Sequence, residues 1–218
     1  MSGTVKFLWV LYGALTLVHL GTCVWDSSGK WRALTKILLM PMVLLCYLAL
    51  AGEPRILVIG AILLGWGGDV LLLYSAQKGF FLAGISSFLA GHLCYAWALG
   101  LRGDFSKPLF TLGLAGTLLL VGVAAYLSLL KYLRDMKLPG AIYLAVILLM
   151  VWTAILSWRE NPGAAGNCIL IGALLFFVSD YTLSSEMFRR PHSWGNVAVM
   201  STYAAGQFLL TTGLAILS

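Results

Sequence analysis

Long apolar segments recur along the whole chain and constrain its fold more than any other feature. Of the 218 residues, 61% are hydrophobic and only 10% are charged. Segments of roughly 20 apolar residues have the length that a helix needs to cross a hydrocarbon layer about 30 Å thick. Transmembrane strands would instead give alternating segments of about ten residues. The sequence therefore predicts an all-α, multi-pass integral membrane protein, in a bacterial inner membrane or the endoplasmic reticulum, with one transmembrane domain over residues 1–218.

Eight membrane spans are expected, separated by short connections rich in Gly, Pro and charged residues. The spans cover about residues 6–25, 33–51, 56–74, 80–101, 108–130, 139–158, 164–182 and 195–217. The longest loop is expected between Ser184 and Trp194. Eight Lys and Arg residues flank the connections after odd-numbered spans, against five on the other face. This difference favours a cytoplasmic location for the odd-numbered connections, with both termini on the opposite side.

Charge and cysteine content suggest no partner beyond the lipid bilayer. The net charge of +6 comes from Lys and Arg residues scattered through the connections, where they set topology and meet lipid headgroups, so no nucleic-acid partner is expected. The four cysteines lie singly inside apolar segments, and the three histidines show no metal-ligand spacing. We therefore expect no metal and no cofactor. The oligomeric state is left open.

Two aspartates, Asp69 and Asp180, are the only acidic residues that fall well inside the apolar spans. An ionised carboxylate is unfavourable in hydrocarbon, so an acid at this depth normally faces the protein interior or a water-filled pocket and marks a functional site. Both lie in the last third of spans that run in the same direction, which predicts that they approach the same membrane face. We expect them to be catalytic; the alternative is a structural role as hydrogen-bonded or helix-capping acids.

The surroundings of the two aspartates repeat along the chain. Gly-Ala-Ile-Leu precedes Gly-Asp at Asp69, and Gly-Ala-Leu-Leu precedes Ser-Asp at Asp180. A second echo joins Phe88-Leu-Ala-Gly-His92 to Tyr203-Ala-Ala-Gly-Gln207. These echoes predict two parallel four-helix repeats, residues 6–101 and 108–217, because an even number of spans preserves the orientation of each half.

Six further polar side chains inside or beside the spans are candidate substrate-binding residues: Lys36, His92, Tyr95, Tyr143, Tyr203 and Gln207. Spacings of three and four residues place His92 with Tyr95, and Tyr203 with Gln207, on single helix faces. The alternative for these pairs is ordinary hydrogen bonding between helices. Lys36 could extend to the membrane surface or pair with a carboxylate, and Tyr143 could be an interface aromatic or a pocket hydroxyl.

At these residues the sequence resembles the lysoplasmalogenase family of multi-pass membrane proteins, also called the YhhN-like family. The resemblance covers essentially the whole chain. It is carried by Gly68-Asp69, Gly84…Phe88…His92…Tyr95, Gly172-Ala-Leu-Leu-Phe176…Ser179-Asp180 and Tyr203…Gln207. It implies eight helices, a single-chain ether lysophospholipid as substrate, and hydrolysis of its vinyl ether bond to a fatty aldehyde and glycerophosphoethanolamine or glycerophosphocholine.

The residues suit that chemistry independently of the resemblance. A vinyl ether is cleaved by protonation of its double bond, which gives an oxocarbenium ion that water captures. One acid must therefore be protonated and the other ionised, as in glycosidases. We expect Asp180 to be the proton donor, among local aromatic residues, and Asp69 to be the more hydrated anion. The alternative function is a small proton-coupled transporter that uses the same two acids.

Overall fold

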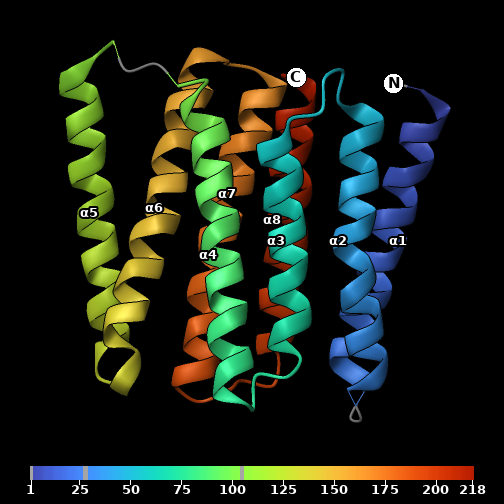
Figure 1. The fold of residues 1–218 in the computed structure, drawn as a ribbon, viewed down its shortest axis with the longest axis vertical. Helices are drawn as coiled ribbons and strands as arrows, with labels where there is room; N and C mark the ends of the chain where they lie inside the picture. The colour runs from blue at the N-terminus through green and yellow to red at the C-terminus, as the bar shows by residue number, and fades with distance from the viewer. Residues whose placement is uncertain (1, 27–28, 104–105) are drawn as a thin grey trace.

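The computed structural model describes residues 2–26, 29–103 and 106–218, and these form eight α-helices and one short 3-10 turn without any strand (Figure 1). The predicted all-α fold and the number of helices are confirmed. The elements are α1 (Gly3–Trp25), α2 (Lys30–Leu50), α3 (Ile56–Leu72), α4 (Lys78–Gly100), α5 (Pro108–Leu130), η1 (Arg134–Met136), α6 (Lys137–Glu160), α7 (Ala164–Phe188) and α8 (Gly195–Ile216).

Consecutive helices alternate in direction, so the two termini lie at the same end of the bundle (Figure 1). Seven of the helices are long and apolar enough to cross a membrane. The remaining helix, α3, has 17 residues and therefore extends about 25 Å. The arrangement is that of a multi-pass integral membrane protein, as predicted.

The largest error in the predicted spans concerns α7. The predicted span ends at residue 182, and the longest loop is predicted to begin at Ser184. The helix continues to Phe188 instead. Its last turn is held by contacts on both sides: Phe188 packs edge to face with Phe81 of α4, and Glu186 accepts hydrogen bonds from the backbone and ring of His192. The connection to α8 is correspondingly shorter than predicted.

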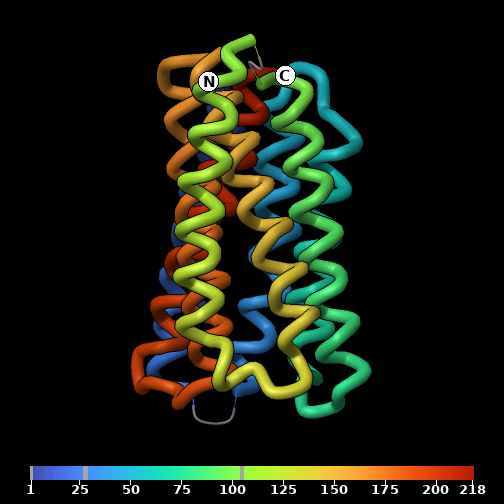
Figure 2. The backbone as a smooth tube through the Cα atoms, turned by 90° about the vertical axis from the view of Figure 1, so that its left-hand side faces the viewer, coloured from blue at the N-terminus to red at the C-terminus, as the bar shows by residue number. Residues whose placement is uncertain are grey.

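Four helices form the centre of the bundle, in two tightly packed pairs: α3 with α4, and α7 with α8. Each pair also contacts a helix from the other half of the chain: α4 packs against α6, and α8 packs against α2. Helix α1 contacts α2 and α8, while α5 is the outermost helix on the other side and contacts α6 and α7 (Figures 1 and 2). The two acid-bearing helices, α3 and α7, therefore lie in the interior.

Glycines allow the close approach within both central pairs. A methyl group on Gly91 of α4 would press against the carbonyl oxygen of Ala61 and the backbone of Gly65 in α3. A methyl group on Gly206 of α8 would likewise meet the carbonyl oxygen of Gly172 and the backbone of Phe176 in α7. Small residues let helix backbones approach closely where lipid supplies no hydrophobic driving force between helices.

Candidate active site

The carboxylate of Asp69 lies in the last turn of α3 and is held by two side chains from other helices. The Lys36 ammonium group of α2 lies 3.1 Å from Oδ1. The Tyr203 hydroxyl of α8 donates a 2.8 Å hydrogen bond to Oδ2. Asp69 is only 2% exposed, so the carboxylate is compensated by one positive charge and one hydroxyl donor in place of water.

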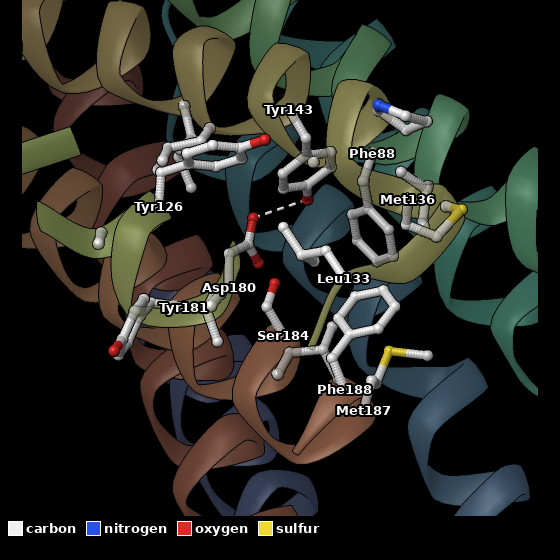
Figure 3. Close-up of a pocket in the computed structure, with 18 of the residues that line it drawn as sticks. Phe88, Tyr126, Leu133, Met136, Tyr143, Asp180, Tyr181, Ser184, Met187 and Phe188 are labelled. Carbon is white, nitrogen blue, oxygen red and sulfur yellow. Dashed lines mark hydrogen bonds between the residues drawn. The ribbon is translucent and has the colours of Figure 1, made fainter. Parts of the chain in front are cut away.

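Asp180 occupies the corresponding position in α7 but has different partners. The Tyr143 hydroxyl of α6 donates a 2.7 Å hydrogen bond to Oδ2 (Figure 3). The Nε2 atom of His92 in α4 lies 3.4 Å from the same oxygen. Neither ring nitrogen of His92 has an aligned hydrogen-bond partner within the described part of the chain. Asp180 thus faces a hydroxyl donor and an imidazole, with no lysine beside it.

The two acids are bound in a crosswise pattern. Each receives one partner from the second helix of its own predicted half, Lys36 in α2 or Tyr143 in α6. Each receives another from the fourth helix of the opposite half, Tyr203 in α8 for Asp69 and His92 in α4 for Asp180. Four of the six polar residues that the sequence singled out therefore converge around the two acids, from four different helices.

Aromatic rings connect the two clusters. The ring of Phe176 lies edge to face with both His92, at 4.7 Å between centroids, and Tyr203, at 5.4 Å. Phe88 packs edge to face against Tyr203 at 6.0 Å. Both phenylalanines lie in the repeated phrases of the sequence, and that position is the signal that they belong to the site.

The other two predicted residues form a buried pair beside this layer. The Tyr95 hydroxyl donates a 2.7 Å hydrogen bond to the side-chain oxygen of Gln207. Neither residue touches a carboxylate in a described contact. Two glycines before Asp69 are closely packed: Gly65 lies against Gln207, and the ring of Phe88 occupies the space beside Gly68.

A large cavity opens beside Asp180. It has an empty volume of about 870 Å³ and is lined by residues of α3 to α7 and the connection between α5 and α6. Its wall is mostly apolar, with Asp180 and Tyr143 facing it together (Figure 3). Its aliphatic and aromatic lining includes Leu72, Phe81, Ile85, Phe88, Leu129, Leu133, Leu144, Ile147, Phe177 and Phe188. The apolar lining suits a hydrocarbon chain.

Only two of the predicted site residues, Asp180 and Tyr143, line this cavity. His92, Tyr95 and Gln207 border a separate small space of about 160 Å³ between α3, α4, α7 and α8. The expectation that Asp69 is the more hydrated acid is wrong. Asp69 is 2% exposed and Asp180 is 8% exposed, because Lys36 and Tyr203 cover Asp69 whereas Asp180 faces the cavity.

Among residues 2–26, 29–103 and 106–218, no three His, Cys, Asp or Glu side chains lie close enough together to hold a metal ion. The donors around the two acids are hydroxyl, ammonium and imidazole groups. Their arrangement suits proton transfer at Asp180 and a stable negative charge at Asp69.

Comparison with known proteins identifies relatives along nearly the whole chain. Lysoplasmalogenase TMEM86B of Homo sapiens is 34% identical over 200 residues, which are 87% of this chain and 79% of that protein. Lysoplasmalogenase TMEM86A of Bos taurus is 34% identical over 156 residues, 66% of this chain and 58% of the relative. The uncharacterized membrane protein YhhN of Escherichia coli O157:H7 is 26% identical over 197 residues, 87% and 91% of the two chains.

No solved structure matches the chain. The match to the YhhN family extends from residue 31 to residue 214 and so includes Asp69, Asp180 and every partner described above. With a match over this range and relatives at 34% identity, the chain belongs to the YhhN family.

Proposed function

We propose that this protein hydrolyses the vinyl ether bond of lysoplasmalogens, with Asp180 as the proton donor and Asp69 as the accompanying anion. Two relatives at 34% identity are named lysoplasmalogenases, which supports the reaction class and the lipid substrate. The substrate would be a lysophospholipid with one ether-linked chain. The products would be a fatty aldehyde and glycerophosphoethanolamine or glycerophosphocholine.

The two interior carboxyl groups have different neighbouring side chains, and this observation carries the proposal. Asp69 is paired with the Lys36 ammonium group, which favours the ionised form. Asp180 instead contacts a tyrosine hydroxyl and a histidine and faces an apolar cavity. Pairs of acids in unlike environments divide the roles of proton donor and anion in enzymes that pass through oxocarbenium ions.

In the proposed reaction the alkenyl chain lies in the cavity with its double bond at Asp180. The Asp180 carboxylic acid gives its proton to the outer carbon of the double bond, which is the one not attached to oxygen. The positive charge is then shared between the inner carbon, which carries the ether oxygen, and that oxygen. Water then adds to the inner carbon and returns a proton to the Asp180 carboxylate. The hemiacetal breaks its bond to the glycerol oxygen, which takes up the hydroxyl proton, so that one water molecule is consumed overall.

The other polar residues would act through the two acids. Tyr143 holds the Asp180 carboxyl in position by its hydrogen bond. His92, whose Nε2 atom lies 3.4 Å from that carboxyl, can accept a proton from water or return one to Asp180. Asp69 does not line the cavity, so its negative charge would stabilise the cation through space, across the layer that contains Phe88 and Phe176.

The decisive test is aldehyde release from purified protein in nonionic detergent. Asp180→Asn is expected to lower the rate by about 10²- to 10⁴-fold, the usual contribution of a general acid. Asp69→Asn should also lower it strongly, because the compensating anion is lost. Glu53→Gln, on an exposed connection, is the matched control and should leave the rate unchanged.

The transporter alternative predicts a different result in the same samples. Protein reconstituted into liposomes would then take up a solute with protons and release no aldehyde. A folded wild-type protein without vinyl ether hydrolysis, or an Asp180→Asn variant with full activity, would overturn the proposed mechanism. The apolar wall around Asp180 favours the hydrolase, because a hydrated ion pathway needs polar groups along its length.

A further inference from the structure

The part of α7 beyond Asp180 forms one wall of the cavity. Ser184, Met187 and Phe188 all line it, and these residues belong to the two helical turns that sequence analysis assigned to a loop. Ser184 is the polar member of this group. Its hydroxyl points toward the Asp180 carboxyl in Figure 3. A hydroxyl group therefore stands one helical turn beyond the proposed proton donor, on the same wall.

Arg189 follows directly at the end of α7. Its Nη2 atom donates a hydrogen bond to the backbone oxygen of Ser128 in α5, and its guanidinium group lies 5.2 Å from the centre of the Tyr132 ring. The Nε atom is buried and has no hydrogen-bond partner within the described ranges. Buried donors are normally satisfied, so an unused guanidinium donor directly after Phe188, which lines the cavity, indicates a place for an acceptor.

The connection between α5 and α6 carries further positive charge at this end of the cavity. Leu133 and Met136 of this connection line the cavity, and the exposed residues around them include Lys131, Arg134 and Lys137. Arg134 has a backbone φ of 44°, which is uncommon outside glycine. Among the acids nearby, Asp135 is exposed and Glu186 is occupied by His192.

Distances along α7 match the order of groups in a glycerophospholipid. With a rise of about 1.5 Å per residue, Ser184 lies about 6 Å and Arg189 about 13 Å beyond Asp180. In a lysoplasmalogen the vinyl ether is followed by the glycerol hydroxyl and then by the phosphate. The phosphorus is six bonds from the ether carbon, or roughly 8 Å in an extended chain. The guanidinium group, which contacts Ser128 and Tyr132 in this structure, would turn toward the cavity to meet the phosphate.

We propose that the last two turns of α7 and Arg189 recognise the glycerophosphate end of the substrate: Ser184 binds the free glycerol hydroxyl and Arg189 binds the phosphate. This assignment rests on the proposed function and adds its specificity. It explains why the substrate has a free glycerol hydroxyl. An acyl group on that oxygen would remove the O–H that donates a hydrogen bond to Ser184. A planar guanidinium group is well suited to phosphate because it offers two parallel donors.

The test compares two vinyl ether substrates in a phosphate-free nonionic detergent, so that bilayer phosphate is absent. The first is lysoplasmalogen, and the second is 1-alkenylglycerol, which keeps the vinyl ether and the hydroxyl but lacks the phosphate. Arg189→Gln is expected to raise the KM for lysoplasmalogen by roughly ten- to a hundredfold, as for loss of a charged hydrogen bond. The KM for 1-alkenylglycerol should change less than about twofold. Arg190→Gln, the exposed neighbour, is the matched control and should behave as wild type.

Ser184 is tested with a third substrate whose glycerol hydroxyl is methylated. Ser184→Ala should raise the KM for lysoplasmalogen about tenfold, and it should have little effect on the methylated analogue, which has already lost that donor. Ser185→Ala, the adjacent serine outside the cavity wall, is the control. Retained turnover of 1-alkenylglycerol shows that the Arg189→Gln protein is folded.

Three outcomes decide the matter. An Arg189→Gln effect confined to the phosphate-bearing substrate supports the inference. Equal effects on both substrates would overturn the phosphate assignment while leaving the hydrolase proposal intact. A wild-type protein that cleaves neither substrate would overturn the proposed function and, with it, this inference.

Discussion

The ammonium group of Lys36 and the carboxylate of Asp69 form an ion pair inside the helix bundle, with 3.1 Å between Nζ and Oδ1. The lysine side chain is 19% exposed, whereas the aspartate is almost fully covered. Asp180, the counterpart of Asp69 in α7, meets Tyr143 where Asp69 meets Lys36. Together with the exchange of Tyr203 for His92 as the second partner, this difference gives the two acids unlike surroundings.

We predict that Lys36→Met lowers the free energy of unfolding by about 3 kcal/mol, because it leaves the Asp69 charge buried without its partner. The double variant Lys36→Met/Asp69→Asn should regain most of this loss, since neither side chain is then charged. Chemical unfolding of the two single variants and the double variant in detergent gives the coupling energy directly. Additive losses in the double variant would mean that the pair contributes no net interaction.

The same double variant separates stability from catalysis. If the Asp69 charge is needed for turnover, the double variant should be stable and yet inactive in aldehyde release. Full activity in the stable double variant would remove Asp69 from the mechanism. Lys6→Met, on an exposed part of α1, is a suitable control for the loss of a lysine.

Tyr143 and Tyr126 both line the cavity, but only Tyr143 donates a described hydrogen bond to Asp180. The hydroxyl of Tyr126 instead donates to the backbone oxygen of Lys137. We predict that Tyr143→Phe lowers kcat by roughly tenfold, equivalent to one hydrogen bond to a charged or reacting group. Tyr126→Phe should change kcat less than about twofold. Steady-state kinetics of the two variants make the comparison, and equal losses would contradict a specific role for Tyr143.

The sequence predicted the helices and the two interior acids well, but it could not predict how the polar residues pair. Helical spacing shows which residues share a face, as for Tyr203 and Gln207, but not which helix that face meets. Lys36 is the example: its sequence position allowed either the membrane surface or a carboxylate, and only the packing of α2 beside α3 selects Asp69. The cavity could not be predicted from the sequence either, because its wall combines side chains from five helices.

The duplication inferred from sequence echoes stays a prediction, and the packing of the central helices supports it. At one constant offset, Ala61, Gly65 and Asp69 in α3 correspond to Gly172, Phe176 and Asp180 in α7. Gly91 of α4 packs on Ala61 and Gly65 of α3. Gly206 of α8 packs on Gly172 and Phe176 of α7. An experimental structure in which helices α1–α4 superpose on helices α5–α8 would establish the repeat.

A second pair of tyrosines distinguishes the acid clusters from ordinary interhelical bonding. Tyr203 donates to the Asp69 carboxylate, and Tyr95 donates to the side-chain oxygen of Gln207. We predict that Tyr203→Phe reduces kcat/KM by at least about tenfold, while Tyr95→Phe reduces stability by about 1 kcal/mol and leaves kcat/KM within about threefold. Kinetics and thermal unfolding on the same preparations separate the two effects. A loss of kcat/KM in Tyr95→Phe larger than this would indicate that the Tyr95–Gln207 pair takes part in the reaction.

The closest helix contact in the centre of the bundle gives the last prediction. A methyl group on Gly172 of α7 would overlap the backbone of Leu210 and the carbonyl oxygen of Gly206 in α8, and backbone atoms cannot move aside as a side chain can. Gly172→Ala should therefore lower the free energy of unfolding by about 1–3 kcal/mol. Gly113→Ala on α5 is the matched control: its methyl group meets no described atom within 4 Å, so it should be neutral or stabilise by up to about 1 kcal/mol. Unfolding of both variants in detergent measures the difference, and a Gly172→Ala protein as stable as wild type would show that α7 and α8 are not packed backbone to backbone.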